Sequence, residues 1–236
     1  MTRDEKPSET EIESKLASLD SDRREIQRSA ADQLSALAKM SEDVRTTLLG
    51  GLRSASRKRR WGAAYALAQA GYCVDGVVLA LLEALGSADA DIRWAAAALL
   101  SAGSDLDGRV DALLGVGASG NPIQRRMVAY TLRDLAPTTH RVENAILERL
   151  VDEDRLVRLA ALTALPILAV TPERCAAEIL STVDRGDAGI FAAGGVALCR
   201  LAARSETVEA VLAHAQLSGD PLAAQALARH HLRRCR

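Results

Sequence analysis

Apolar residues recur along the chain at helical spacing, in segments separated by short polar turns. The segments from Val74 to Leu85 and from Val142 to Val151 each place their apolar residues on one helix face. The whole pattern predicts an all-α solenoid of about seven helix pairs. First helices are expected at residues 9–19, 41–53, 74–85, 105–115, 140–151, 172–183 and 205–215. Second helices are expected at residues 23–39, 57–70, 90–102, 122–135, 155–169, 188–203 and 221–233.

The turns before the second helices carry residues that start helices. Side-chain oxygens in these turns can accept hydrogen bonds from the unpaired N–H groups of a first helical turn. Proline suits the first helical position, where its missing N–H is not needed. The capping turns are Ser21-Asp22, Ser87 to Asp91, Asn121-Pro122 and Asp152 to Asp154, and the candidate first-position prolines are Pro122, Pro172 and Pro221.

One short pattern repeats through the second helices. It consists of an arginine, an alanine three residues later, and Leu or Ala six or seven residues after the arginine. The arginines are Arg28, Arg60, Arg93, Arg126 and Arg158, at separations of 32, 33, 33 and 32 residues. The alanines are Ala31, Ala63, Ala96, Ala129 and Ala161. A constant period of this length is typical of a stack of repeats.

Two copies of this pattern resemble HEAT repeats, specifically the short bacterial type also seen in phycobilisome lyase proteins. They are Asp91-Ile92-Arg93-Trp94-Ala95-Ala96 and Leu156-Val157-Arg158-Leu159-Ala160-Ala161. The resemblance covers nearly the whole chain and implies a right-handed α-α superhelix of the HEAT or armadillo kind. It also implies that the second helices line the concave surface. Repeat type transfers no activity.

The chain of 236 residues shows no linker or change of composition that would divide it. We therefore expect a disordered tail at residues 1–8 and a single solenoid at residues 9–236. Pro166 is expected to interrupt its helix, and glycine lowers helix propensity. A bend or change in curvature is expected between residues 160 and 200, where the glycines are Gly189, Gly194 and Gly195.

Composition narrows the class of protein. Ala and Leu dominate and aromatic residues make up only 3%, which favours helices packed through small side chains. The net charge of −1 argues against a protein that coats nucleic acid or membrane with its whole surface. The start of the chain lacks an apolar leader segment, and no stretch is long and apolar enough to span a membrane, so we expect a cytoplasmic protein.

The four cysteines are widely spaced and are expected to be reduced. Cys73, Cys175 and Cys199 are expected to pack like small apolar residues, and Cys235 is expected in a frayed tail.

Charge is segregated between the two kinds of helix. The second helices with their turns carry a net positive charge, and the first helices carry a net negative one. This predicts a basic concave face and an acidic convex one. The alternative is that the charges simply solvate helix ends. The residues that supply most of the basic excess are Arg57, Lys58, Arg59, Arg60, Arg125, Arg126 and Arg133.

Large apolar side chains are expected to point away from the core. At about 100° per residue, the position after each repeated arginine lies opposite the core positions. That position holds Ser29, Trp61, Trp94, Met127 and Leu159, and Tyr65 lies on the same side as Trp61. Such a row predicts a surface that anchors a partner, although packing between repeats would explain it as well.

Motifs for catalysis or cofactor binding are missing from the sequence. It contains no Gly-rich phosphate loop, no Gly-x-Ser-x-Gly and no metal-spaced Cys and His set, so we predict no enzyme, cofactor or metal. His230, His231 and Cys235 form the one local cluster, which is more typical of a basic helix end than of a metal site. Asp134 is expected to form an ion pair with Arg126 or Arg133.

The sequence favours a non-catalytic adaptor that binds an acidic protein segment on its basic, Trp-containing concave face. A nucleic-acid-binding protein is the first alternative, because the chain is somewhat similar to HEAT-like alkylpurine DNA glycosylases. That resemblance would place Trp61 and Trp94 in a DNA cleft and make Asp134 catalytic, but the chain is less basic and poorer in aromatic residues. A bilin lyase subunit is the second alternative. The sequence determines neither the partner nor the oligomeric state.

Overall fold

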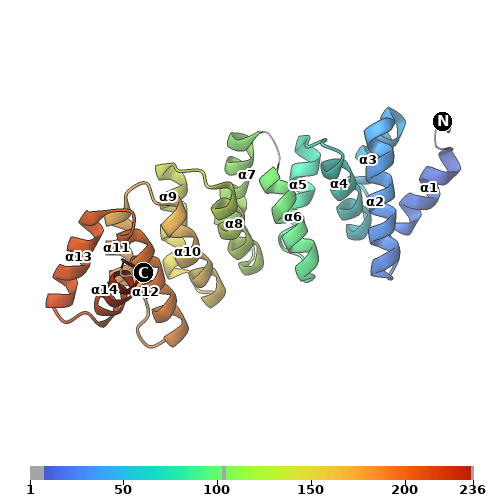
Figure 1. Ribbon diagram of the computed structural model, residues 1–236. Helices are drawn as coiled ribbons and strands as arrows, with labels where there is room; N and C mark the ends of the chain where they lie inside the picture. Colours follow the sequence, from blue (N-terminus) through green and yellow to red (C-terminus); the bar gives the residue numbers. More distant parts are fainter. Residues whose placement is uncertain (1–7, 103–104, 235–236) are drawn as a thin grey trace. The chain divides into compact units, whose positions relative to one another are not determined.

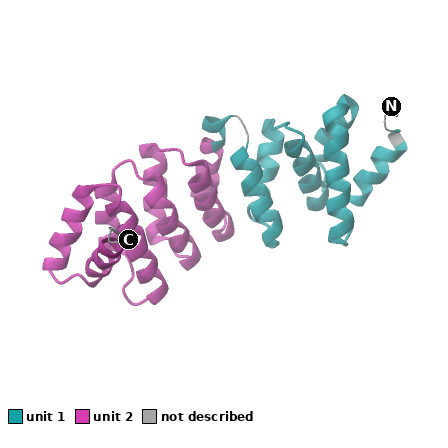
Figure 2. Ribbon diagram, in the orientation of Figure 1, with its two compact units in different colours: residues 1–109 teal, residues 110–236 magenta. Residues whose placement is uncertain are grey.

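The computed structural model describes residues 8–102 and 105–234, which form helices joined by turns. The chain groups into two compact units, residues 1–109 and 110–236 (Figure 2). Each unit is an α-solenoid of stacked helix pairs, which confirms the predicted fold class. Most of the predicted disordered tail lies outside the described residues, but the Ser8 side chain accepts a hydrogen bond from the Glu11 N–H and caps the first helix. A single continuous body remains a prediction.

In unit 1 the second helices pack side by side, α2 on α4 and α4 on α6, and each also packs against the first helix of its own pair (Figure 1). The first helices are α1 (Glu9–Ser18), α3 (Glu42–Gly51) and α5 (Asp75–Ala84). The second helices are α2 (Arg24–Met40), α4 (Arg57–Gln69) and α6 (Ala90–Ala102).

Unit 2 repeats this arrangement, with α8 packed on α10, α10 on α12 and α12 on α14. The boundary between the units falls within α7 (Leu106–Ser119). The other first helices are α9 (His140–Glu148), extended by the short 3-10 helix η1 (Arg149–Val151), α11 (Pro172–Thr182) and α13 (Glu206–Leu217). The second helices are α8 (Pro122–Leu135), α10 (Arg155–Leu168), α12 (Ala188–Ala202) and α14 (Pro221–Arg234). Predicted and observed bounds agree to within a few residues.

Capping explains several of these starts. Asn121 and Gln124 form a reciprocal capping box, with Pro122 as the first residue of α8. The Asp154 carboxylate caps α10 by accepting from two backbone N–H groups. The predicted cap at Ser21-Asp22 is wrong. The cap residue of α2 is Arg23, and its side chain makes no capping hydrogen bond.

The repeated alanines lie where neighbouring helices meet. All five are at most 5% exposed: Ala31, Ala63, Ala96, Ala129 and Ala161. Small side chains at this position let the helices approach closely. The periodic alanine pattern therefore reports core packing.

The repeated arginine has a structural task at the fourth position of a second helix. Its backbone N–H makes the first helical hydrogen bond, to the carbonyl of the cap residue, in Arg60, Arg93 and Arg158. Its guanidinium donates to two carbonyls of the preceding turn. The Nη1 distances are 2.8 and 3.1 Å from Arg60 to Ser54 and Ala55, 2.8 and 2.9 Å from Arg93 to Ser87 and Ala88, and 2.8 and 3.1 Å from Arg158 to Asp152 and Glu153. The side chain thus fastens the turn onto its helix.

Other residues perform this task in α2 and α8. The same first backbone bond is made there by Gln27 and Arg125. Gln27 Nε2 donates to the Leu19 carbonyl at 2.9 Å, and Arg125 Nη1 donates to the Gly120 carbonyl at 3.0 Å. Arg28 and Arg126 therefore stand at the fifth helical position, one residue after the residue that bonds to the turn. The prediction that all five arginines are equivalent is wrong for these two.

Pro166 does not interrupt its helix, contrary to the prediction. It lies in the last turn of α10, and the Arg204 guanidinium donates to the carbonyls of Pro166 and Ala169 at the helix end. The α12 helix also continues through Gly194, where an added Cβ would lie 3.1 Å from Val183 Cγ2. This glycine therefore serves close packing, and the change in curvature remains a prediction.

The cysteines differ in exposure. Cys175 and Cys199 are buried as predicted, but Cys73 is exposed and not packed, and all three are free thiols. Burial, reinforced by the neighbouring Glu143 carboxylate, raises the pKa of Cys175 to about 12. Cys235 lies outside the described residues.

The described helices include none that is both long and apolar enough to cross a membrane.

Candidate functional site

A groove of about 340 Å³ lies on the second-helix face of unit 1. We call it the second-helix groove. Side chains of α2, α4 and α6 line it together with the turn before α6. Its lining includes Arg24 and Arg28 from α2, Trp61 and Tyr65 from α4, and Asp89, Asp91 and Ile92 from the α6 region.

Two aromatic rings form the α4 side of this groove. Trp61 and Tyr65 are one helical turn apart, with ring centroids 5.6 Å apart and planes tilted by 56°. Both are partly buried. Gly62, between them, allows α4 to pack closely, since a Cβ there would lie 2.6 Å from Leu19 Cδ2. The predicted pairing of Trp61 with Tyr65 on one side of the helix agrees with this geometry.

Tyr65 is held by a neighbouring repeat. Its hydroxyl donates to Asp32 Oδ1 of α2 at 3.3 Å and accepts from Gln69 Nε2. Burial, followed by the charge of Asp32, raises the pKa of the Tyr65 phenol. The ring is therefore a neutral, oriented surface at ordinary pH.

An ion pair joins the two outer walls of the groove. Arg24 Nη2 on α2 lies 2.8 Å from Asp89 Oδ2, and its Nη1 lies 3.8 Å from Asp91 Oδ2. This contact links the first and third repeats of unit 1 past α4. The Arg24 side chain is 74% exposed, so the pair adds little stability.

Arg28 differs from the other charged lining residues. Within residues 8–102 and 105–234, its guanidinium makes no hydrogen bond or ion pair. It shares the fifth helical position with Trp61, Trp94, Arg126 and Leu159, which we call the fifth-position column. None of these five side chains is fully buried. The column therefore offers arginine and tryptophan to the surface in unit 1 and arginine and leucine in unit 2.

Met127 does not belong to this outward column, contrary to the prediction. It is 1% exposed and lies in the core of unit 2. The reason is the one-residue shift in α8, which places Met127 at the sixth position together with Gly62 and Ala160, both buried. Trp94 is 47% exposed and lies on α6, but it is not among the residues that line the groove.

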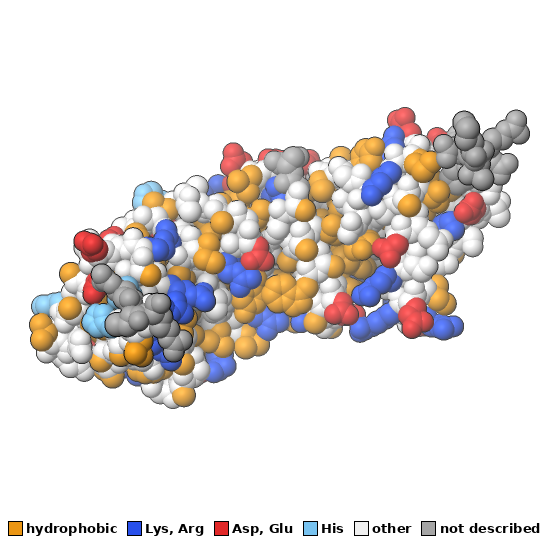
Figure 3. All heavy atoms as spheres, viewed as in Figure 1, with side chains coloured by type: hydrophobic (Ala, Val, Ile, Leu, Met, Phe, Trp, Pro, Cys, Tyr) orange, Lys and Arg blue, Asp and Glu red, His pale blue; other side chains and the backbone are white. Residues whose placement is uncertain are grey.

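Each residue of the basic run at the start of α4 lies near an acid of the same chain. Arg59 Nε bonds to Asp20 Oδ2 at 2.9 Å, and Arg60 Nη2 bonds to Glu83 Oε1 at 2.7 Å. Arg57 is also near Glu83, at 3.5 Å, and Lys58 pairs with Asp22. Figure 3 shows acidic and basic side chains interspersed on the visible face of unit 1.

These contacts also lower the pKa values of the acids. A hydrogen bond from Ser56, with those from Arg59, lowers the pKa of Asp20 despite the opposing effect of burial. The Arg60 hydrogen bond lowers the pKa of Glu83. The arginines therefore bind carboxylates of their own chain.

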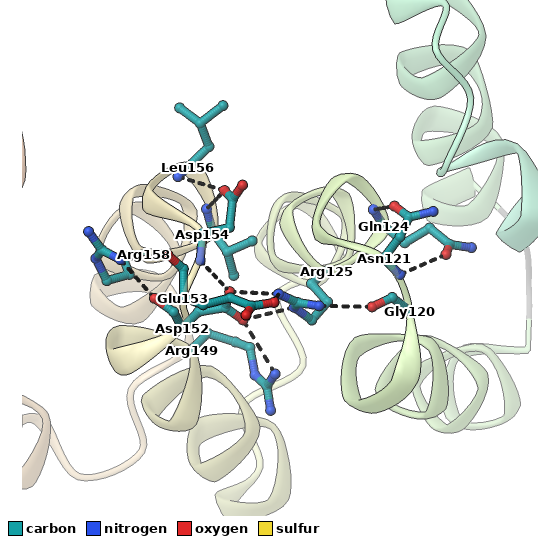
Figure 4. A network of polar contacts seen from close by, with 11 residues as sticks. Gly120, Asn121, Gln124, Arg125, Arg149, Asp152, Glu153, Asp154, Leu156 and Arg158 are labelled. Carbon is teal, nitrogen blue, oxygen red and sulfur yellow. Dashed lines mark hydrogen bonds and ion pairs between the residues drawn. The ribbon is translucent and has the colours of Figure 1, made fainter.

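In unit 2 the predicted site residue Arg125 likewise bonds to acids of its own chain (Figure 4). It bonds to both carboxylate oxygens of Asp152 at 2.8 Å and to Glu153 at 3.2 Å. Asp152 also lies 3.5 Å from Arg149. Burial of Asp152 acts to raise its pKa, but the Arg125 and Asp154 hydrogen bonds outweigh this and lower it.

Similar pairs join the later repeats. Arg155 Nη2 bonds to Asp187 Oδ1 at 2.9 Å, and Arg185 Nη2 bonds to Asp220 Oδ2 at 2.6 Å. The Arg155 hydrogen bond, with backbone donors, holds the pKa of Asp187 well below its usual range. We call these contacts and the Arg125–Asp152 pair the Arg–Asp ladder. Their partners are 27 to 35 residues apart, so each contact joins successive repeats.

Of the remaining predicted site residues, Arg133 has local partners. Arg133 pairs with Asp134 at 2.8 Å and lies 5.2 Å from the Tyr130 ring centroid, which confirms the expected ion pair of Asp134. Arg126 is partly buried on α8. Its role in binding remains a prediction.

The histidines at the end of α14 gather around one carboxylate. His230 and His231 lie 3.6 and 3.3 Å from Glu209. The third member of the predicted cluster, Cys235, lies outside the described residues. Among the side chains that are described, no group of three or more His, Cys, Asp or Glu could hold a metal ion.

The chain matches no protein-family model, and no curated protein matches it. The solved structures that are similar to it include the following three. Two are engineered proteins. One has 20% identity and a TM-score of 0.43, covering 81% of this chain and 96% of the other. The second has 19% identity and a TM-score of 0.49, covering 93% and 68%.

The third similar structure is a designed armadillo repeat protein in complex with the peptide (KR)4. It has 16% identity and a TM-score of 0.37, and the match covers 93% of this chain and 99% of that one. At these identities and TM-scores, the three structures do not bear on what this chain binds.

Proposed function

We propose that this protein is a binding scaffold that holds a peptide segment of a partner protein in the second-helix groove of unit 1. The observation that carries the proposal is the groove itself, which presents the Trp61 and Tyr65 rings inside a rim of charged side chains. Partly buried aromatic side chains in a pocket supply much of the affinity of protein interfaces.

The extent of the groove favours an elongated ligand. Three successive second helices contribute to it, so its axis crosses the repeats. Solenoids commonly bind extended partners along such surfaces because equivalent side chains recur at each step. A peptide can place one apolar side chain against the aromatic pair and continue past the neighbouring helices.

The charges support a protein ligand over a nucleic acid. Asp89 and Asp91 on the α6 side balance the two arginines of the groove, so its lining offers no net positive charge to a phosphate backbone. The basic run at the start of α4 is already paired with acids. We further assign the repeats to the HEAT type, on the recurring Arg-x-x-Ala pattern, and propose a non-catalytic role.

A random peptide library selected on the full chain tests the proposal. Peptides enriched on the wild-type protein are expected to lose about tenfold or more in affinity for Trp61→Ala, because the variant removes a large contact surface. Leu79→Ala is the control, since Leu79 is 66% exposed on α5 and lies outside the groove. It should bind like the wild type. Circular dichroism checks that both variants are folded.

The proposal is contradicted if Trp61→Ala binds the enriched peptides as tightly as the wild type. It also fails if no peptide is enriched while a single-stranded oligonucleotide binds at low salt in a Trp61-dependent way.

A further inference from the structure

The second-helix groove contains one guanidinium that none of the described residues pairs with. Arg24 is engaged by Asp89, whereas Arg28 has no hydrogen-bond or ion-pair partner in the described part of the chain. Arg28 is exposed and lines the groove on its α2 side. A carboxylate brought into the groove would therefore find a cation that is free to bind it.

The register of α2 explains why Arg28 is free. In α4 and α6 the arginine of the repeat stands at the fourth position and bonds to the carbonyls of the preceding turn. In α2 this task belongs to Gln27, whose amide donates to the Leu19 carbonyl. Arg28 is displaced to the fifth position, the position that Trp61 occupies on the neighbouring helix.

The acids around the groove restrict where a ligand carboxylate can lie. Asp32 accepts a hydrogen bond from the Tyr65 hydroxyl. Neither of these two residues forms a hydrogen bond or ion pair with Arg28. Asp89 and Asp91 lie on the α6 side. A negatively charged ligand group is repelled from that side and attracted to the α2 side.

We propose that Arg28 is the specificity-determining residue of the groove and binds a carboxylate of an acidic peptide segment. The same segment places a neighbouring apolar side chain against Trp61 and Tyr65. Arginine suits this role because its planar fork can donate two parallel hydrogen bonds to one carboxylate. The inference rests on the proposed function, to which it adds the chemistry of the partner.

Peptide selection on charge-reversed variants tests the proposal. A random library is selected in parallel on the wild type, on Arg28→Glu and on Arg53→Glu. Arg53 is an exposed residue of unit 1 outside the groove. Arg53→Glu therefore makes the same change of charge at a position that does not line the groove.

The wild type and Arg53→Glu are expected to enrich peptides with Asp or Glu beside an aromatic or aliphatic residue. Arg28→Glu is expected to enrich Lys or Arg at that place instead. A peptide from the wild-type pool should bind Arg28→Glu at least about tenfold more weakly and Arg53→Glu within about twofold. Replacing its acidic residue by lysine should restore binding to Arg28→Glu.

The outcomes separate the two proposals. If Trp61→Ala abolishes binding but Arg28→Glu keeps the same peptide preference, Arg28 does not set specificity and the proposed function stands. If the wild-type pool lacks acidic residues, the inference is wrong. If neither variant affects binding, the groove is not the binding site and both proposals fail.

Discussion

The Gln27 side-chain amide donates a hydrogen bond to the Leu19 carbonyl at 2.9 Å, which fastens the turn between α1 and α2. Arginine does the corresponding task in α4, α6, α8 and α10. Two neighbouring positions thus have separate roles. From α2 to α10, the fourth position of a second helix stabilises its turn, and the fifth position holds side chains that are at least partly exposed.

Removing a fourth-position arginine should destabilise unit 1. Arg93→Met takes away two charge-assisted hydrogen bonds to the Ser87 and Ala88 carbonyls and should lower the free energy of unfolding by about 1–3 kcal/mol. Arg28→Met is the matched control, because Arg28 fastens no turn, and its effect should stay within about 0.5 kcal/mol. Urea denaturation measures both. Equal losses in the two variants would contradict the division between the positions.

The buried Glu143 should be a strong contributor to the stability of unit 2. Its carboxylate on α9 is fully buried, and its Oε2 accepts from the Val170 and Thr171 N–H groups, both at 2.6 Å, at the start of α11. Glu143→Ala leaves these donors unsatisfied and should cost about 2–4 kcal/mol.

The control for Glu143 lies on the same helix. Glu148 has a side chain that is 69% exposed. In thermal denaturation, Glu148→Ala should melt close to the wild type. A melting temperature of Glu143→Ala equal to that of Glu148→Ala would show that the cap on α11 is dispensable.

The Arg125–Asp152 contact should make stability depend on acid pH. The Asp152 pKa is lower in the folded protein than in the unfolded chain, where it is about 3.9. The contribution is therefore fully present above that value and is lost as the pH falls through the folded-state pKa. Asp152→Asn should cost about 3 kcal/mol at neutral pH, because the Asp152 side chain is only 3% exposed and Arg125 loses its buried partner.

The deficit of Asp152→Asn should stay constant from neutral pH down to about pH 3.9, where the unfolded chain begins to gain the proton, and should shrink at lower pH. Urea midpoints measured across this range test the sign. Glu153→Gln is the control, since the Glu153 side chain is 82% exposed. A deficit that grows as the pH falls would contradict the assignment.

Two glycine substitutions should act in opposite directions. Gly62→Ala places a Cβ 2.6 Å from Leu19 Cδ2, which is fully buried, so crowding should cost about 1–3 kcal/mol before the helix-propensity gain of about 1 kcal/mol. Gly115→Ala in α7 meets nothing within 4 Å and should stabilise by about 0.5–1 kcal/mol. Thermal denaturation of both variants measures the signs. Stabilisation by both would mean that α4 has room to move away from Leu19.

The helices could be predicted from the sequence because each one carries its own apolar periodicity and start signals. Pro122 and Asp154 mark helix starts at the residue level. The buried alanines were predictable for the same reason, since a repeated small residue at a constant period implies a repeated close contact.

Side-chain roles within the repeat depend on a finer register. Aligning Arg126 with Arg60 put Met127 in the outward column, although the start of α8 at Pro122 makes Arg125 the turn-fastening residue. The direction of a side chain changes by about 100° per residue, so a shift of one position exchanges core and surface. Proline at the first position of α8 was the signal that could have corrected this alignment.

The ion pairs could not be predicted by counting charge on each helix. Arg59 and Asp20 are 39 residues apart, and Arg155 and Asp187 are 32 apart. Such contacts depend on which turn lies beside which helix start. Charge that looks like a basic excess in the sequence is thus paired with acids of neighbouring repeats. Arg28, not among the predicted site residues, has no ion-pair partner in the part of the chain that the structure describes.

The central claim is that Trp61 lines an open groove that a peptide fills. The most direct test is acrylamide quenching of the Trp94→Phe variant, in which Trp61 is the one remaining tryptophan. Trp61 should be quenched readily in the free protein and become protected when a peptide selected on the wild type is added to saturation. Quenching that is unchanged by the bound peptide, or an indole already shielded in the free protein, would contradict the account.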